Sequence, residues 1–96
     1  DLKDGTYENF SMGMNAPVTV VVTVENGVVS SVTVQDSANE YDAPYVQKVQ
    51  DEAFLSQFAG LTAAVQEQDI DLVSGATVSG RAVLRAVDLV IDHADQ

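Results

Sequence analysis

Residues 18–34 read VTVVVTVENGVVSSVTV, in which two runs of mostly β-branched residues flank an Asn-Gly pair. β-Branched side chains favour an extended backbone, so the runs predict strands at residues 18–24 and 28–34. Both central residues of a type I′ turn need a positive φ, which Asn26 and Gly27 accept more readily than other residues. The stretch therefore predicts a tight β-hairpin.

A further strand is predicted before this hairpin, at residues 6–12. The three strands together form an antiparallel meander with one apolar and one more polar face. In the strand at residues 28–34, strict alternation places Val28, Val32 and Val34 on one face and Val29 on the other.

Helical signals follow the meander. Residues 35–43 are polar and predict a loop, after which Pro44 suits the first turn of a helix. Asp51 is a suitable N-cap for a second helical piece that Gly60 ends, so this region forms either two short helices or one bent helix. The sequence leaves residues 61–68 open between a helix and a connecting segment.

The last helix is predicted at residues 78–94, where apolar side chains recur at helical spacing behind Thr77, a good N-cap residue. The apolar run of Ile70, Leu72 and Val73 is a candidate for a further strand. The expected fold is a single α+β domain over residues 1–96, an antiparallel β-meander with helices packed on one face, because that arrangement buries every apolar stripe.

Composition narrows the classes of function. The 96 residues include no cysteine, which excludes disulfides and thiolate metal sites, and fifteen Asp and Glu against four Lys and Arg give a formal net charge of −11. A field of that sign repels polyphosphate backbones, so we expect no nucleic-acid partner. No apolar stretch approaches the roughly 20 residues of a membrane span, so we expect none within this chain.

The turn at residues 71–77, Asp-Leu-Val-Ser-Gly-Ala-Thr, lies where the last helix is predicted to begin. Backbone N–H groups and the positive end of the helix dipole converge at such a point and favour a phosphate. Gly75 allows close approach of a ligand to the backbone, and Thr77 offers a hydroxyl. By spacing alone, a threonine that merely caps the helix is the favoured interpretation, because Ser and Thr are ordinary N-cap residues.

Residues 71–77 resemble the Asp-x-x-Ser/Thr-Gly-Ala-Thr signature of the FMN-binding domain family, and residues 4–7, 13–20 and 54–60 resemble other segments of that family. The resemblance implies that Thr77 carries FMN through a phosphoester bond to the ribityl phosphate. It implies further that neighbouring residues of the turn and helix start contact the cofactor or present the hydroxyl. These are Asp71, Ser74, Gly75, Ala76 and Val78.

Outside this turn, Arg81 is the expected ionic partner of the phosphate, because it follows Thr77 by one helical turn. The alternative is an exposed arginine that pairs loosely with Asp88 or another carboxylate.

Ring contacts are less well defined, because the chain departs from the family pattern. Many relatives have Glu-Thr-Pro-Gly after the third strand, whereas residues 39–44 read Asn-Glu-Tyr-Asp-Ala-Pro. Glu40 is the one match there, and Tyr41 is a candidate for stacking on the flavin. Met14 replaces the usual aromatic residue of the first turn and either contacts the flavin or fills the core.

The resemblance implies an electron carrier rather than a turnover enzyme, with no catalytic residue and no metal ligand of its own. Its expected partners are a magnesium-dependent flavin transferase that uses FAD, and a redox partner protein or a membrane-associated quinone reductase complex. The expected location is extracytoplasmic, in a bacterium, on an anchor outside this sequence. The alternatives are a cofactor domain of a larger flavin-dependent reductase and a structural module that holds no flavin.

Overall fold

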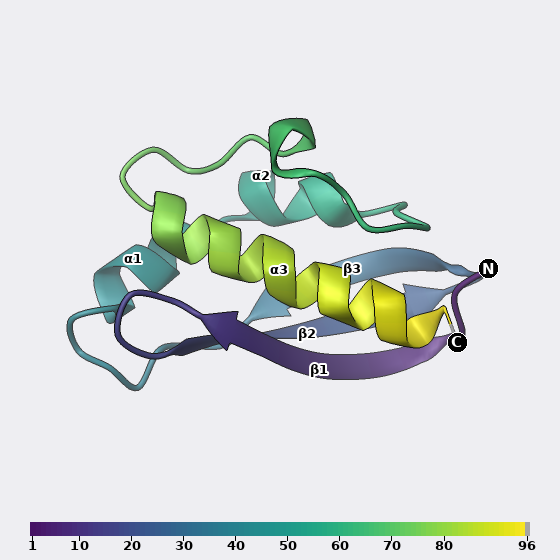
Figure 1. The fold of residues 1–96 in the computed structure, drawn as a ribbon, viewed down its shortest axis with the longest axis horizontal. Helices are drawn as coiled ribbons and strands as arrows, with labels where there is room; N and C mark the ends of the chain where they lie inside the picture. The colour runs from purple at the N-terminus through teal and green to yellow at the C-terminus, as the bar shows by residue number, and fades with distance from the viewer. Residues whose placement is uncertain (96) are drawn as a thin grey trace.

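The computed structural model describes residues 1–95, in which three strands precede all the helices (Figure 1). The strands β1 (Gly5–Met12), β2 (Pro17–Glu25) and β3 (Val28–Val34) form one antiparallel sheet in the order β1-β2-β3. The helices are α1 (Ala43–Lys48), α2 (Glu52–Leu55) and α3 (Thr77–Ala94), with 3-10 turns η1 (Ser56–Phe58) and η2 (Glu67–Asp69). The expected α+β meander is confirmed.

The hairpin between β2 and β3 forms as the Asn-Gly pair predicts. Asn26 has a φ of 55° and Gly27 a φ of 79°, which are the positive values that a type I′ turn requires. Asp4 also stabilises the turn, because its carboxylate accepts hydrogen bonds from the N–H groups of both residues, at 3.1 and 2.9 Å.

The strict alternation predicted for β3 is wrong, because a β-bulge interrupts the strand. Thr23 pairs with Ser31, but the next residue of β2, Val24, pairs with Val29. Ser30 is therefore the extra residue, and its hydroxyl donates to the carbonyl of Thr23 at 3.1 Å. As a result Val29, and not Val28, is buried together with Val32 and Val34.

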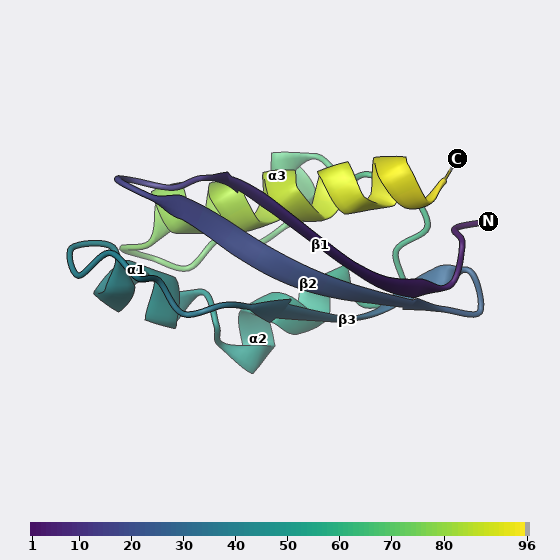
Figure 2. The same cartoon turned by 90° about the horizontal axis from the view of Figure 1, so that it is seen from below.

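The core lies between the apolar face of the sheet and the helices. α3 runs along β1 and β2 (Figure 2), and α2 with η1 packs against β3. Val20 and Val22 of β2 are fully buried, as are Val83 and Val87 of α3, and Phe54 and Phe58 meet edge to face with ring centroids 5.6 Å apart. This packing holds α3 along the whole length of the sheet.

The two short helices, rather than one bent helix, connect the sheet to α3. Pro44 lies in the first turn of α1, and Asp51 is the N-cap of α2, although its side chain makes no capping hydrogen bond. Residues 61–66 form no helix, and η2 follows them with a capping box in which Gln66 and Asp69 each accept a backbone N–H of the other.

The expected strand at Ile70, Leu72 and Val73 is absent, and this expectation is wrong. β3 offers its free edge to residues 60 and 61 instead, since Val29 exchanges hydrogen bonds with Gly60 and Leu61 at 2.7 and 2.9 Å. The backbone N–H and carbonyl of Asp71 are bonded by the side-chain amide of Gln57. The segment stays extended and buries Ile70 in the core without joining the sheet.

The two ends of the described chain meet at one end of the molecule, which is 38 Å long (Figure 1). The N–H of Lys3 donates to the carbonyl of Ala94 at 2.8 Å, which ties the residues before β1 to the last turn of α3. Among residues 1–95, no helix has the length and hydropathy that a bilayer crossing requires.

Phe58 provides a test of the core. Replacement by Ala removes a ring with 0% exposure and leaves a cavity, so we expect Phe58→Ala to lower the free energy of unfolding by about 3–5 kcal/mol. Phe10, which is 60% exposed on β1, is the matched control, and Phe10→Ala should change stability by about 0.5 kcal/mol or less. Urea denaturation measures both, and equal losses would contradict this description of the core.

Candidate functional site

A pocket of about 270 Å³ lies at the end of the molecule where α1, the turn between β1 and β2, and the first turn of α3 come together. This is the end opposite to the chain termini (Figure 1). The pocket is lined by residues of all three segments: Met14, Tyr45, Gly75, Ala76, Thr77, Val78 and Ser79. It therefore includes five consecutive residues around the start of α3.

Thr77 does not cap α3, so the expectation of an N-cap threonine is wrong. Ala76 is the N-cap: its carbonyl accepts the first helical hydrogen bond, from Gly80, at 2.9 Å, and its N–H donates to Val73. No side chain makes a capping hydrogen bond at this helix end. The hydroxyl of Thr77, a half-buried residue, is thus left for another role.

The first turn of α3 presents unused donors to the pocket. Within the described residues, the backbone N–H groups of Thr77, Val78 and Ser79 bond to no acceptor, as expected for the first turn of a helix. Three adjacent N–H groups at the positive end of a helix dipole form a good anion site. The pocket therefore has the donor chemistry that a phosphate requires.

The turn that precedes Thr77 depends on Gly75. Its φ of +80° is a left-handed value that residues with a Cβ rarely adopt. Ala76 is buried beneath the turn, whereas Ser74 is exposed and does not line the pocket. Of the residues expected in this turn, the structure thus brings Gly75, Ala76, Thr77 and Val78 to the pocket.

Partly exposed apolar side chains form the walls of the pocket. Met14, Tyr45 and Val78 keep about two-fifths of their surface exposed although they are large and hydrophobic. Such side chains suit the faces of a planar ring system. Met14 is an expected contact, whereas Tyr45 is not, because nothing in the sequence indicates that α1 turns this residue toward the start of α3.

A buried carboxylate holds the Met14 turn in place. Asp42 is 1% exposed, and it accepts hydrogen bonds from the N–H groups of Asn15 and Ala16 and from the side-chain amide of Asn15, at 2.8 to 3.0 Å. Burial acts to raise the pKa of Asp42, but these three donors outweigh it and hold the pKa below its ordinary value. A Cβ at Gly13 would lie 2.9 Å from the carbonyl of Ala16, so the turn is closely packed.

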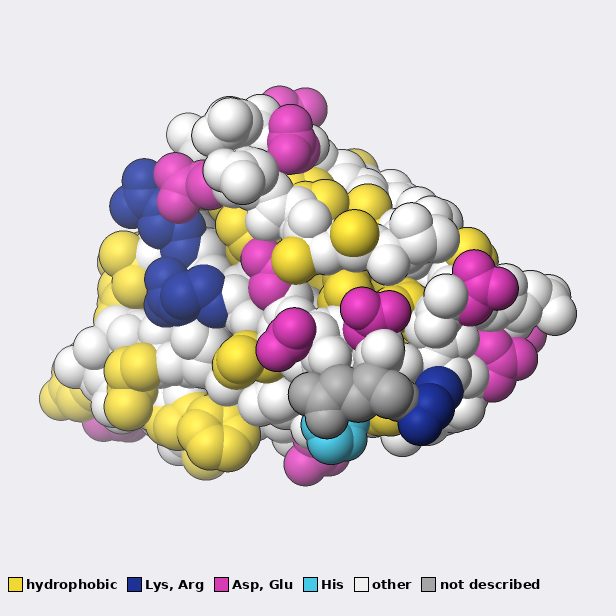
Figure 3. Space-filling model, turned by 45° about the vertical axis from the view of Figure 1, so that its right-hand side comes forward, with side chains coloured by type: hydrophobic (Ala, Val, Ile, Leu, Met, Phe, Trp, Pro, Cys, Tyr) yellow, Lys and Arg dark blue, Asp and Glu magenta, His cyan; other side chains and the backbone are white. Residues whose placement is uncertain are grey.

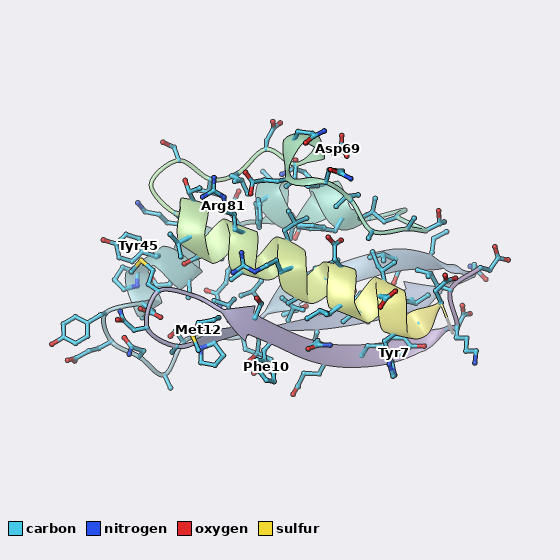
Figure 4. All side chains as sticks on the ribbon, in the orientation of Figure 1. Tyr7, Phe10, Met12, Tyr45, Asp69 and Arg81 are labelled. Atoms are coloured by element: carbon cyan, nitrogen blue, oxygen red, sulfur yellow. The ribbon has the colours of Figure 1, made fainter. Side chains whose placement is uncertain are left out.

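Arg81 does not reach toward the pocket as an unpaired cation. Its guanidinium donates to both carboxylate oxygens of Glu67, at 2.8 and 3.2 Å, and Figure 4 shows it extending toward the segment that carries Asp69. The pairing with Asp88 is also absent, since that carboxylate accepts the N–H of Val65. A surface pairing with another carboxylate, which was the alternative, is thus present, with Glu67.

Lys48 is the basic residue that lies at the turn. A Cβ added to Gly75 would lie 3.2 Å from the Lys48 ammonium nitrogen, which also lies 6.0 Å from the centre of the Tyr45 ring. Acidic side chains are scattered over the face of the molecule seen in Figure 3, in keeping with the formal charge of −11. Sequence reasoning missed Lys48, because 29 positions separate it from Thr77.

Three other expected contacts lie outside the pocket lining. Tyr41 is 71% exposed, and Glu40 is exposed beside it in the loop before α1. Asp71 borders a different hollow, together with Phe54 and Gln57. No group of three or more potential metal ligands converges in the described part of the chain.

These features define a small α+β domain with an anion-accepting pocket at the start of its last helix. A family model described as the FMN-binding domain matches residues 13–92, which include the whole pocket. The chain belongs to the FMN-binding domain family, as residues 71–77 indicate, and it is a flavin-binding domain.

A relative in Treponema pallidum (strain Nichols), described as an uncharacterized protein, is 32% identical over 96 aligned residues. The alignment covers 97% of this chain and 24% of the relative, so the chain spans about a quarter of that protein's length. No solved structure shows a significant match.

The Asp42 contacts predict a pH dependence of stability. Because folding lowers the pKa of Asp42, the ionised carboxylate stabilises the folded state. This contribution to the free energy of unfolding is complete above the unfolded pKa of about 3.9, and it is lost as the pH falls through the folded pKa. In Asp42→Asn, an amide N–H₂ replaces a carboxylate oxygen that accepts a hydrogen bond, so wild type should be the more stable protein at pH 7. The difference should shrink as the pH falls below about 4.

Urea denaturation over a series of pH values measures this difference. Glu40→Gln, at an exposed residue of the same loop, is the control and should follow wild type. A stability difference between wild type and Asp42→Asn that stays constant down to acidic pH would contradict the assignment.

Proposed function

We propose that this domain carries FMN covalently on Thr77, through an ester between the threonine oxygen and the ribityl phosphate, and that it serves as an electron-transfer module. The observation that carries the proposal is the half-buried, non-capping Thr77 in a pocket with three unbonded backbone N–H groups, in a chain of the FMN-binding domain family. Residues 71–77 also match the family's signature for threonine attachment.

The chemistry of the donor set supports the phosphate position. The N–H groups of Val78 and Ser79, at the favourable end of the α3 dipole, would hold the phosphate of a phosphoester at Thr77. Gly75 leaves the adjacent backbone open to close approach. Met14, Tyr45 and Val78 would then contact the isoalloxazine ring, which accepts and donates electrons when bound.

Attachment requires a second protein, a flavin transferase that uses FAD and magnesium. The Thr77 oxygen forms a bond to the phosphorus of the FMN half, the pyrophosphate P–O bond breaks, and AMP leaves with the electron pair. The hydroxyl proton passes to a base of the transferase or to water. Asp71 and Ser74 do not line the pocket, but both are exposed and so accessible to such an enzyme.

A covalent bond suits a protein of this charge. A formal charge of −11 repels free FMN, which is itself an anion, so equilibrium binding alone would hold the cofactor weakly. A tether also prevents loss of the cofactor outside the cytoplasm, where we place this domain. Its electron donors and acceptors would be a redox partner protein or a quinone reductase complex.

A second candidate is a cofactor domain within a larger flavin-dependent reductase. The observation that favours it is the length of the Treponema relative, of which this chain matches 24%. In that case Thr77 has the same role, and the electrons pass to another domain of the same protein.

The test is the mass of the protein after coexpression with a flavin transferase. Wild type should gain the mass of one FMN less one water and absorb in the visible flavin bands. Thr77→Ala should gain nothing, while its thermal unfolding stays close to that of wild type, because Thr77 makes no capping hydrogen bond.

Thr33→Ala is the matched control, because it removes the hydroxyl of an exposed threonine on β3 that does not line the pocket. It should remain flavinylated. A wild-type protein that stays colourless and unmodified would favour a module without flavin, and modification of Thr77→Ala would overturn the assignment of the attachment site.

A further inference from the structure

We propose that Lys48 is the cation that binds the flavin phosphate at Thr77, the role that sequence spacing assigns to Arg81. This inference rests on the proposed function and adds to it one residue from α1, 29 positions before the attachment site. The observation behind it is the position of the Lys48 ammonium group at the Gly75 turn, directly before the helix start that carries Thr77.

The other basic residues are engaged elsewhere. Arg81 forms a bidentate ion pair with Glu67. Arg85 donates to the hydroxyl of Ser11 at 2.9 Å and to the carbonyl of Met12 at 3.0 Å. Lys3 is bonded through its backbone to Ala94 at the far end of α3, roughly 27 Å from the first turn of that helix.

Lys48 is free to meet an anion. In residues 1–95 the ion pair of Arg81 with Glu67 is the only one, so no described carboxylate neutralises the Lys48 ammonium. Its nitrogen lies 3.2 Å from where a Cβ of residue 75 would be, so the absence of that atom leaves the ammonium group room at the turn. The side chain is exposed, and its four-carbon stem can turn the ammonium group toward a ligand at the neighbouring Thr77.

The charge of the domain explains why a cation is needed beside the phosphate. A phosphodiester keeps one negative charge at neutral pH, and this domain already has a formal charge of −11. Backbone N–H groups supply partial charges, whereas an ammonium group supplies a full one, and hydrogen bonds to a charged partner are stronger than neutral ones. Lys48 thus offsets the repulsion that the acidic protein imposes on the phosphate.

The experiment compares wild type, Lys48→Gln and Lys48→Arg, with Lys3→Gln as a control that removes the same charge far from the pocket. The first readout is the initial rate of flavinylation by the transferase with FAD and magnesium, followed by mass. We expect the rate to fall about tenfold in Lys48→Gln, to stay near wild type in Lys48→Arg, and to be unchanged in Lys3→Gln.

The second readout does not involve the transferase. It is the change in Tm between the unmodified and the fully flavinylated form of each variant, at low and at high salt. Lys48→Gln should lose about 4–8 °C of the gain that wild type shows at low salt, and the difference should narrow at high salt. The unmodified forms should melt together, because Lys48 is exposed and makes no ion pair in the described chain.

The outcomes separate the two proposals. If wild type gains no flavin at all, the proposed function fails. If wild type is flavinylated and Lys48→Gln matches it in both readouts, the function stands and the role of Lys48 is overturned. A slower rate with an unchanged gain in Tm also overturns the role of Lys48, because Lys48 would then contact the transferase and not bind the phosphate.

Discussion

Packing of α3 against the apolar face of β1 and β2 is the constraint on which the site depends. The helix buries Val83, Val87 and Val90 against the valines of the sheet along its whole length, so its first turn is fixed in position at one end of the molecule. The donors of that turn are then a property of a rigid element and not of a mobile loop. Asp42 fixes the opposite wall in the same way, through three hydrogen bonds to the turn after β1.

Local sequence signals predicted most of the fold. The valine runs, the Asn-Gly pair and the periodicity of the last helix each depend on residues within one element, and their boundaries agree to within about one residue. The errors arise where a distant partner intervenes. Gly60 and Leu61 bond the free edge of β3, and Gln57 bonds the backbone of Asp71, so the expected further strand cannot form. The alternating pattern of residues 28–34 does not indicate the bulge at Ser30.

The pocket residues also divide into those that a local sequence signal indicates and those that distant segments bring together. Residues 75–78 could be assigned from the sequence, because the turn, the helix start and the threonine are contiguous. Tyr45 and Lys48 could not, because the path of the chain through α1 decides whether Tyr45 reaches the pocket and Lys48 reaches Gly75. Arg81 shows the converse: helical spacing places it one turn from Thr77, but Glu67 in a separate segment pairs with its guanidinium.

The bond between Lys3 and Ala94 has a consequence for how the domain can be built into larger assemblies. Because the chain enters and leaves side by side, at the end of the molecule away from α1, a segment fused to either terminus would start at the end opposite the pocket. A linker attached there would tether the domain without covering the pocket. The pocket would therefore stay accessible in a protein that joins this domain to other polypeptide at either terminus.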